Sequence, residues 1–127
     1  MSATVNHAVY NSTPSHIKDM PLAQWEHTFT SNLTSSFLVI RAYLRQLEAQ
    51  SAADKAKAAI VLIGSTAGKY GEAGHADYAA TKSAMMGGLM LSLKNEIVKI
   101  APRGRVNTIA PGWVATPMVA SALQNDE

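Results

Sequence analysis

Two side chains with complementary acid–base chemistry stand four residues apart in this sequence, Tyr78 and Lys82. Residues four apart share one face of a helix, so a helix that begins near Tyr78 would bring a phenol and an amine together. A phenol alone is a poor acid or base at neutral pH because its pKa is about 10. A neighbouring ammonium group favours the phenolate and moves the phenol toward useful proton transfer. Such pairs also occur by chance on exposed helices, so the surrounding elements must show whether this one is a site.

A strand is predicted before this pair and another after it. Residues 59–63 are apolar and mostly β-branched, which is typical of a strand in a parallel sheet that is covered on both faces. This strand stops at Gly64 and Ser65. A helix is predicted from about Tyr78 to Ile100, and a second buried strand over residues 105–110 is closed by Pro111 and Gly112.

The order strand, helix, strand predicts a right-handed βαβ unit in a parallel sheet. In such sheets ligands bind beyond the carboxyl ends of the strands. Ser65 and residues 111–116 follow those ends, and Tyr78 begins the helix between them. Ser65 is therefore placed to hydrogen-bond an oxygen that gains or loses a proton.

The first half of the chain contains a longer helical pattern. Apolar residues from Leu22 to Leu47, Trp25 among them, recur every three or four positions, and Pro21 is well suited to a helix start. We expect one helix from Pro21 to about Gln50, with this apolar stripe facing the core. Residues 4–6 are expected to end a strand; residues 10–20 and 69–77 are expected to form loops, and residues 51–57 a polar connection.

Composition excludes several classes of protein. With 127 residues the chain is long enough for one domain and too short for two. Its net charge is +2 with scattered basic residues, so we expect no nucleic-acid partner. It has no cysteine, and its four histidines show no metal-ligand spacing, so neither a disulfide nor a metal site is expected. No signal peptide or membrane span is recognisable, and a cytoplasmic protein without a membrane partner is expected.

Three segments in this order resemble consecutive signatures of the short-chain dehydrogenase/reductase family. They are Ile63-Gly64-Ser65-Thr66-Ala67-Gly68, Tyr78-Ala79-Ala80-Thr81-Lys82-Ser83-Ala84, and residues 106–116, which read Val-Asn-Thr-Ile-Ala-Pro-Gly-Trp-Val-Ala-Thr. The resemblance covers nearly the whole chain. It implies an α/β fold, here a three-stranded part of a Rossmann-type parallel sheet with long flanking helices, forming one partial domain over residues 1–127.

The resemblance also implies roles for individual residues. The family's catalytic Ser, Tyr and Lys fall on Ser65, Tyr78 and Lys82, and its catalytic Asn falls on Asn32 in the long helix, where it would help to hold a water in a proton relay. From the residues alone, Asn32 is equally well read as a structural amide. The cofactor-binding positions implied by the family are Asn6, Tyr78, Lys82, Pro111, Gly112, Val114 and Thr116.

Two departures from the family pattern matter. The family's Asn-Asn-Ala-Gly motif corresponds to Asn6-His7-Ala8-Val9, of which Asn6 is retained as a cofactor-side residue. The family's glycine-rich phosphate-binding turn has no counterpart, because the loop that contains Gly71 and Gly74 follows the wrong strand. The chain thus resembles a fragment, truncated at both ends.

The function implied is reversible hydride transfer between NAD or NADP and a small-molecule carbonyl/alcohol pair, with a homo-oligomer expected for the full-length form. The sequence leaves the substrate and the choice of cofactor open. The alternative is a truncated, non-catalytic remnant that keeps the site residues and at most pairs with a full-length relative. Gly87 and Gly88, in mid-helix, suggest close helix packing of the kind that forms dimer interfaces in the family.

Overall fold

The computed structural model describes residues 2–5, 9–10 and 13–114, with the backbone alone for residues 2–5. Within these residues the chain forms a three-stranded sheet of order β1-β2-β3. The strands are β1 (Ser2–Val5), β2 (Ala59–Ile63) and β3 (Arg105–Ile109). Both pairs are parallel, with Ala3 opposite Ile60 and Ile60 opposite Val106. The parallel α/β sheet expected from the sequence is confirmed.

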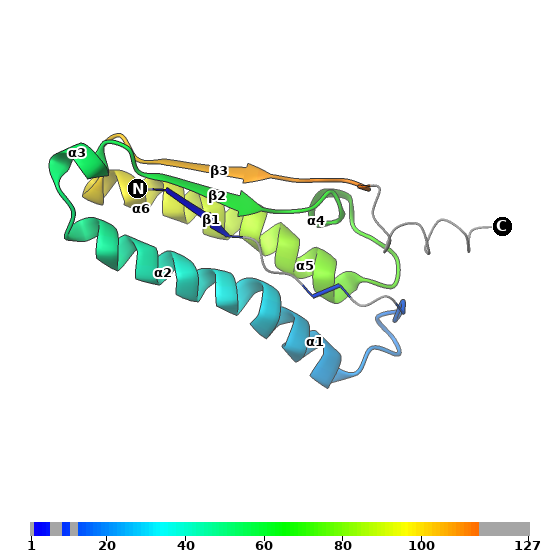
Figure 1. Cartoon of the computed structure of the whole chain (residues 1–127). Coiled ribbons are helices and arrows are strands. Elements are labelled where there is room, and N and C mark those ends of the chain that lie inside the picture. The colour runs from blue at the N-terminus through cyan, green and yellow to red at the C-terminus, as the bar shows by residue number, and fades with distance from the viewer. Residues whose placement is uncertain (1, 6–8, 11–12, 115–127) are drawn as a thin grey trace.

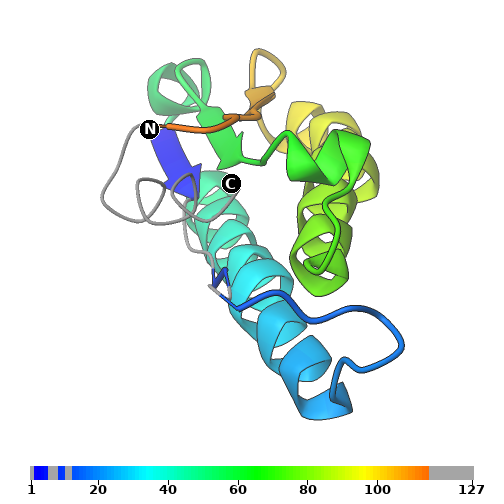
Figure 2. The same ribbon diagram turned by 90° about the vertical axis from the view of Figure 1, so that its right-hand side faces the viewer.

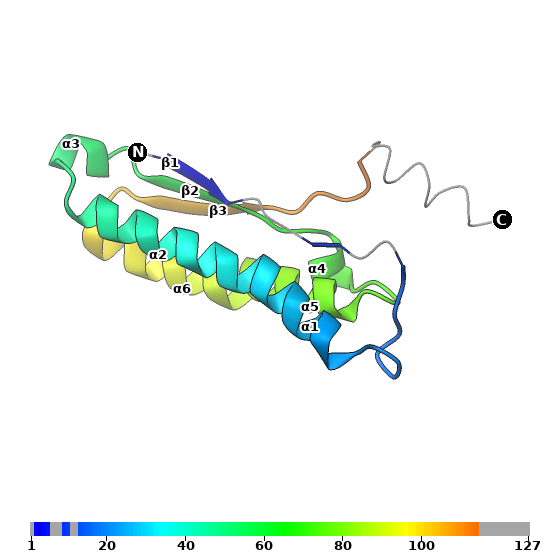
Figure 3. The same ribbon diagram turned by 60° about the horizontal axis from the view of Figure 1, so that its bottom comes forward.

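Two long helical rods lie side by side against one face of this sheet (Figures 1, 2 and 3). The first connects β1 to β2 and the second connects β2 to β3, so both crossovers lie on the same side. Ile60, Leu62 and Val106 point from the sheet into the core between sheet and rods. The core cluster is completed by Ile40, Tyr43, Leu47, Ala58, Met85, Leu93, Ile97 and Ala101.

The first rod consists of α1 (Leu22–Phe29), a π-helical turn η1 (Thr30–Thr34) and α2 (Ser35–Glu48). One continuous helix was expected here, and the π turn is the difference. At the start of α2 the Ser36 hydroxyl donates to the Asn32 carbonyl oxygen of the turn at 2.7 Å, and the Ser35 hydroxyl donates to the Ser31 carbonyl oxygen. Such side-chain bonds compete with the regular helical ladder, and π turns often mark functional positions.

The predicted buried stripe of the first rod is wrong in its first half. Leu22 is 69% exposed, Phe37 is 45% exposed and Trp25 also lies at the surface. The buried side chains there are Thr28 and Asn32, followed by Ser36. The reason lies in the facing helix, which presents polar groups at this end, so the hydrophobic periodicity indicates the core face only from Ile40 onward.

The second rod consists of α5 (Ala76–Ala84), η2 (Met85–Leu89) and α6 (Met90–Ile100). Met85, Leu93 and Ile97 lie on one face of this rod and are almost fully buried. A Cβ at Gly87 or Gly88 would meet no atom within 4 Å, so neither glycine packs closely against another described element. Close packing of these glycines against a second chain stays a prediction.

Two short helices occupy segments that were expected to be irregular. The connection after the first rod contains α3 (Ala52–Lys55), whose N-cap is the Ser51 side chain, which accepts from the Asp54 amide at 3.2 Å. The segment after β2 contains α4 (Ala67–Tyr70), which ends at Gly71 with φ 78°. Glycine adopts this φ without the strain a side chain would introduce.

The other face of the sheet carries none of the described helices (Figures 1 and 3). Burial of β2 on both faces and burial of β3 were expected, and this expectation is wrong for the described residues. Arg105, Asn107 and Ile109 are exposed, and Val61 is only partly buried. None of the helices in the described part of the chain combines the length and apolar character that crossing a membrane requires.

Candidate active site

The loops that follow β2 and β3 are joined by backbone hydrogen bonds. The Gly64 amide donates to the Ile109 carbonyl at 2.7 Å, and the Thr66 amide donates to the Pro111 carbonyl at 2.9 Å. Ser65 lies between these two bonds and is partly exposed. Its hydroxyl oxygen accepts from the Ala67 amide at 3.2 Å, which fixes the serine at the start of α4. The sequence prediction that Ser65 lies at the carboxyl ends of the strands is confirmed.

Lys82 reaches this strand end from α5. Its Nζ donates a hydrogen bond of 2.8 Å to the carbonyl oxygen of Ile63, the last residue of β2. The side chain is only 1% exposed, and this burial lowers the pKa of the Lys82 amine below its usual value. The amine therefore loses its proton at a lower pH than an exposed lysine does.

The close approach of α4 to α5 depends on a glycine. A Cβ on Gly68 would lie 2.8 Å from the backbone carbonyl carbon of Lys82 and 2.8 Å from the Ser83 nitrogen. Backbone atoms cannot move aside as a flexible side chain would. Gly68 therefore allows the segment that carries Ser65 to lie against the turn that carries Lys82.

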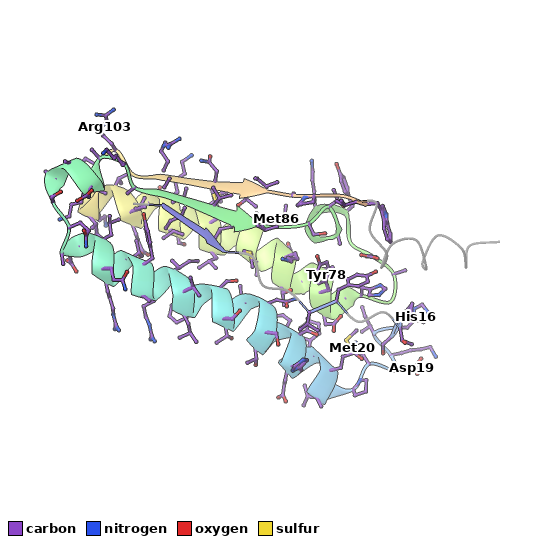
Figure 4. The ribbon with its side chains drawn as sticks, viewed as in Figure 1. His16, Asp19, Met20, Tyr78, Met86 and Arg103 are labelled. Atoms are coloured by element: carbon purple, nitrogen blue, oxygen red, sulfur yellow. The ribbon has the colours of Figure 1, made fainter. Side chains whose placement is uncertain are left out.

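Tyr78 lies one helical turn before Lys82, near the end of the molecule where β2 and β3 finish (Figure 4). The Lys82 Nζ is 5.7 Å from the centroid of the Tyr78 ring, and the phenol is partly exposed. The predicted juxtaposition of phenol and amine on one helix face is confirmed. This arrangement can exchange a proton with a ligand at the strand ends and support the charge that results.

Asn32 is fully buried and its side chain connects three parts of the fold. Its Oδ1 accepts from the Val9 amide at 2.6 Å, while its Nδ2 donates to the Val9 carbonyl at 3.1 Å and to the Thr81 hydroxyl at 3.2 Å. Asn32 thereby joins the segment after β1 to the residue that precedes Lys82. These contacts are those of a structural amide beside the site; the water relay implied by the family resemblance stays a prediction.

The residues expected at the nicotinamide end of a cofactor fall into two groups. Gly112 and Val114 are exposed and Pro111 is partly buried, all directly beyond β3. Asn6 and Thr116 lie outside the described residues. The nicotinamide end fits this donor set, since residues 112–114 are exposed and carry amide and carbonyl groups that a carboxamide can bind. The Thr66–Pro111 bond holds this segment against the loop that carries Ser65. No adenosine or pyrophosphate contact is assigned to any of these residues.

A buried carboxylate beside Tyr78 was missed by the sequence interpretation. Asp77 Oδ2 accepts from the Thr28 hydroxyl at 2.7 Å and from Gln24 Nε2 at 3.2 Å, and its Oδ1 accepts from the Tyr78 amide at 2.9 Å. Burial opposes ionisation of Asp77, but the hydrogen bonds from Thr28, the Tyr78 backbone and Gln24 outweigh it and lower the pKa of this carboxyl. The available signal was an acidic residue directly before the predicted helix start at Tyr78, where the helix dipole favours a carboxylate.

A second cluster was also missed, and it contains His75, which was expected to be an ordinary surface or loop residue. His75 is 6% exposed and stacks on Tyr10, with ring centroids 4.4 Å apart. Its Nδ1 lies 3.6 Å from Glu72 Oε1. No group of three or more metal-ligating side chains occurs among the described residues.

Comparison with known proteins gives a consistent result. The profile of the family described as short chain dehydrogenase matches residues 3–127. The 3-oxoacyl-acyl-carrier-protein reductase FabG of Vibrio cholerae is 36% identical over 105 residues, which are 82% of this chain and 38% of that protein. The 3-alpha-(or 20-beta)-hydroxysteroid dehydrogenase of Mycobacterium bovis is 35% identical over 103 residues, 80% of this chain and 36% of that protein.

A solved structure has the same arrangement of elements. The 3-oxoacyl-acyl-carrier-protein reductase of Brucella melitensis superposes with a TM-score of 0.79 at 32% identity, over 94% of this chain and 43% of that one. A second structure of a reductase of this name from that organism, with bound NAD, gives a TM-score of 0.78 at 30% identity, over 97% of this chain and 45% of that one. The chain thus spans about two fifths of the length of these relatives. On the profile match and the identities together, the chain belongs to the short chain dehydrogenase family.

Proposed function

We propose that this chain carries the catalytic side of an oxidoreductase that interconverts a carbonyl and an alcohol with NAD or NADP. The observation that carries the proposal is the placement of Lys82, whose Nζ is bound to the last carbonyl of β2 and lies 5.7 Å from the ring of Tyr78. This places an amine and a phenol together at the end of the sheet where ligands of such folds bind. The names of the relatives and the NAD-bound neighbour support the same reaction class.

In this proposal each residue has a defined task. Tyr78 gives a proton to the carbonyl oxygen during reduction and removes it during oxidation. Ser65 donates a hydrogen bond to the same oxygen, and Lys82 stabilises the charge that develops on the phenol. The nicotinamide, when bound, supplies or accepts the hydride. Asn32 holds the segment after β1 against Thr81, and through it the turn that carries Lys82.

The cofactor positions are part of the proposal. Pro111, which is partly buried, is followed by Gly112 and Val114, which are exposed beyond the end of β3. Tyr78 and Lys82 would offer a hydroxyl and an amine to the ribose next to the nicotinamide. Asn6 and Thr116 are proposed on the family pattern alone. The relatives' names include both an acyl-carrier-protein substrate and steroids, so the substrate is proposed only as a small carbonyl or alcohol.

The test measures nicotinamide absorbance with NADPH or NADH and ethyl acetoacetate as the carbonyl probe. Wild-type protein should oxidise the cofactor. Tyr78→Phe should lower kcat by roughly three orders of magnitude, with cofactor affinity within about twofold, because the lost hydroxyl acts on the proton. Tyr70→Phe is the matched control, since Tyr70 is 75% exposed. An equal loss of kcat in both variants, or a normal kcat for Tyr78→Phe, would contradict the role assigned to Tyr78. If the wild-type chain neither oxidises nor binds the cofactor, the non-catalytic alternative is favoured.

A further inference from the structure

The segment that follows β1 is fixed in place by Asn32. Both backbone polar groups of Val9 are held by the buried Asn32 amide, at 2.6 Å and 3.1 Å. With both groups bound to one buried side chain, the chain enters the next residue in a defined direction. That residue is Tyr10, which is partly buried.

The Tyr10 side chain is held at its hydroxyl and at one ring face. Its hydroxyl donates to Glu72 Oε1 at 2.6 Å, and its ring stacks on His75 with the planes inclined by 9°. Burial and the Glu72 carboxylate raise the pKa of the Tyr10 phenol, so this hydroxyl keeps its proton and its hydrogen bond at neutral pH. Glu72 and His75 belong to the loop before α5, which is also bonded to the segment after β1 through the Ser15 amide and the Gly74 carbonyl, 2.8 Å apart.

The ring fixed in this way meets the ring of Tyr78. The two centroids are 5.0 Å apart and the planes are inclined by 89°, the edge-to-face geometry that aromatic pairs favour. The Lys82 Nζ, at 5.7 Å from the centroid, is a further neighbour of the Tyr78 ring. A tyrosine side chain has two torsions to fix, and a partly exposed one needs such neighbours to occupy a single orientation.

We infer that Tyr10 is a positioning residue for Tyr78: held by Glu72 and His75, it keeps the Tyr78 ring in one orientation beside Lys82. The expected effect on turnover rests on the acid/base role proposed for Tyr78. The expected effect on the orientation of the Tyr78 ring does not depend on that role. By the same reasoning Asn32 contributes to the positioning of Tyr10, because it binds the backbone of Val9, the preceding residue.

The test uses NMR on the full chain with isotopically labelled tyrosine, and measures the couplings that report the χ1 rotamer of Tyr78. The wild-type chain should show a single rotamer. In Tyr10→Leu the ring contact is lost and the couplings should become averaged over rotamers. Tyr10→Phe keeps the ring but loses the bond to Glu72, so its couplings should lie between the wild-type and the Tyr10→Leu values. Tyr70→Leu, which removes an exposed ring, is the control and should change nothing.

A Tyr10→Leu chain that is folded by circular dichroism and keeps the wild-type couplings would overturn the inference. If that variant does not fold, Glu72→Ala decides in its place. It releases the Tyr10 hydroxyl and leaves the core intact, so unchanged Tyr78 couplings would again overturn the inference, and averaged couplings would support it.

Kinetics with NADPH and ethyl acetoacetate provide the second readout. Tyr10→Leu should lower kcat on the order of tenfold with little change in the KM for NADPH, because misorientation of a reacting group costs rate more than binding. Averaged couplings in a protein whose wild type has no turnover would uphold the positioning role and reject the proposed function. Normal wild-type turnover with unchanged Tyr78 couplings in Tyr10→Leu would support the proposed function and reject the positioning role of Tyr10.

Discussion

The Asp77 carboxylate accepts a hydrogen bond of 2.7 Å from the Thr28 hydroxyl, and both side chains are almost fully buried. This bond ties α1 to the first turn of α5, one residue before Tyr78. A carboxylate in the first turn of a helix is also stabilised by the helix dipole. The relative position of the two rods at the site end of the molecule therefore depends on a polar contact.

The first prediction concerns this bond. Thr28→Val keeps the shape of the side chain but removes the donor, so we expect the free energy of unfolding to fall by about 1.5–3 kcal/mol, the usual contribution of a hydrogen bond to a charged group. Urea denaturation followed by circular dichroism measures it. Thr34→Val is the matched control, because Thr34 is exposed on the same rod. If the two substitutions lowered the free energy of unfolding equally, the Thr28–Asp77 bond would contribute no more than an exposed hydroxyl does.

The same carboxylate predicts how stability responds to acid. The pKa of Asp77 is lower in the folded chain than its usual value of 3.8, so the unfolded chain binds the proton first as pH falls. Its contribution is therefore complete above that value and is lost as pH drops through the folded pKa. Asp77→Asn should unfold with a shallower dependence on pH below about 4 than the wild type. Parallel pH curves for the two chains would contradict the prediction.

Lys82 predicts a slope of the same sign at high pH. Burial lowers the pKa of this amine in the folded chain, so the unfolded chain binds more protons between the folded pKa and the usual value of 10.5. Stability should therefore rise with pH in that window. Lys82→Met should remove the rise, measured by urea denaturation of both chains as pH approaches 10.5; ionisation of the tyrosines, which both chains share, cancels in the difference. Lys94→Met, on the exposed face of α6, should leave the slope unchanged.

The core of the candidate site was predictable from sequence because it depends on local rules. The four-residue spacing of Tyr78 and Lys82 and the strand before Ser65 follow from helix geometry and hydrophobic pattern. The parallel strand order then brings them to one edge of the sheet, as the structure confirms.

Other parts of the site were not predictable in this way. Tyr10 and Glu72 are 62 residues apart, and their contact depends on the paths of two loops that no periodicity describes. The buried stripe of the first rod was wrong because Thr28 and Asn32 face polar groups of α5. Hydrophobic periodicity identifies apolar core faces, but it does not identify buried polar contacts between two helices.

Two glycines predict changes of opposite sign. A Cβ on Gly68 would lie 2.8 Å from the Lys82 and Ser83 backbones, so Gly68→Ala must push α4 away from α5 and should cost about 1–3 kcal/mol of stability. A Cβ on Gly87 meets no atom within 4 Å, so Gly87→Ala should stabilise the helix by up to about 1 kcal/mol. Thermal melts of both variants measure the two effects. A Gly68→Ala chain as stable as the wild type would show that the close approach is not needed.

The last prediction concerns the face of the sheet opposite the rods. Its side chains include Val61 and Ile63, which are partly buried, and Ile109, which is 56% exposed on β3, an edge strand of the sheet that the described residues form. An edge strand offers unpaired backbone groups, and an apolar edge is a site of pairing with other chains. We therefore expect the 127-residue chain to self-associate, with sedimentation velocity showing oligomers that grow with concentration. Ile109→Lys should reduce this association because a charge on an edge strand opposes pairing. Ile17→Lys, at a residue 79% exposed in the loop before α1, should not reduce it. A monodisperse wild-type monomer with a cooperative thermal melt would contradict the prediction. If Ile109→Lys and Ile17→Lys changed the association equally, the association would not depend on β3.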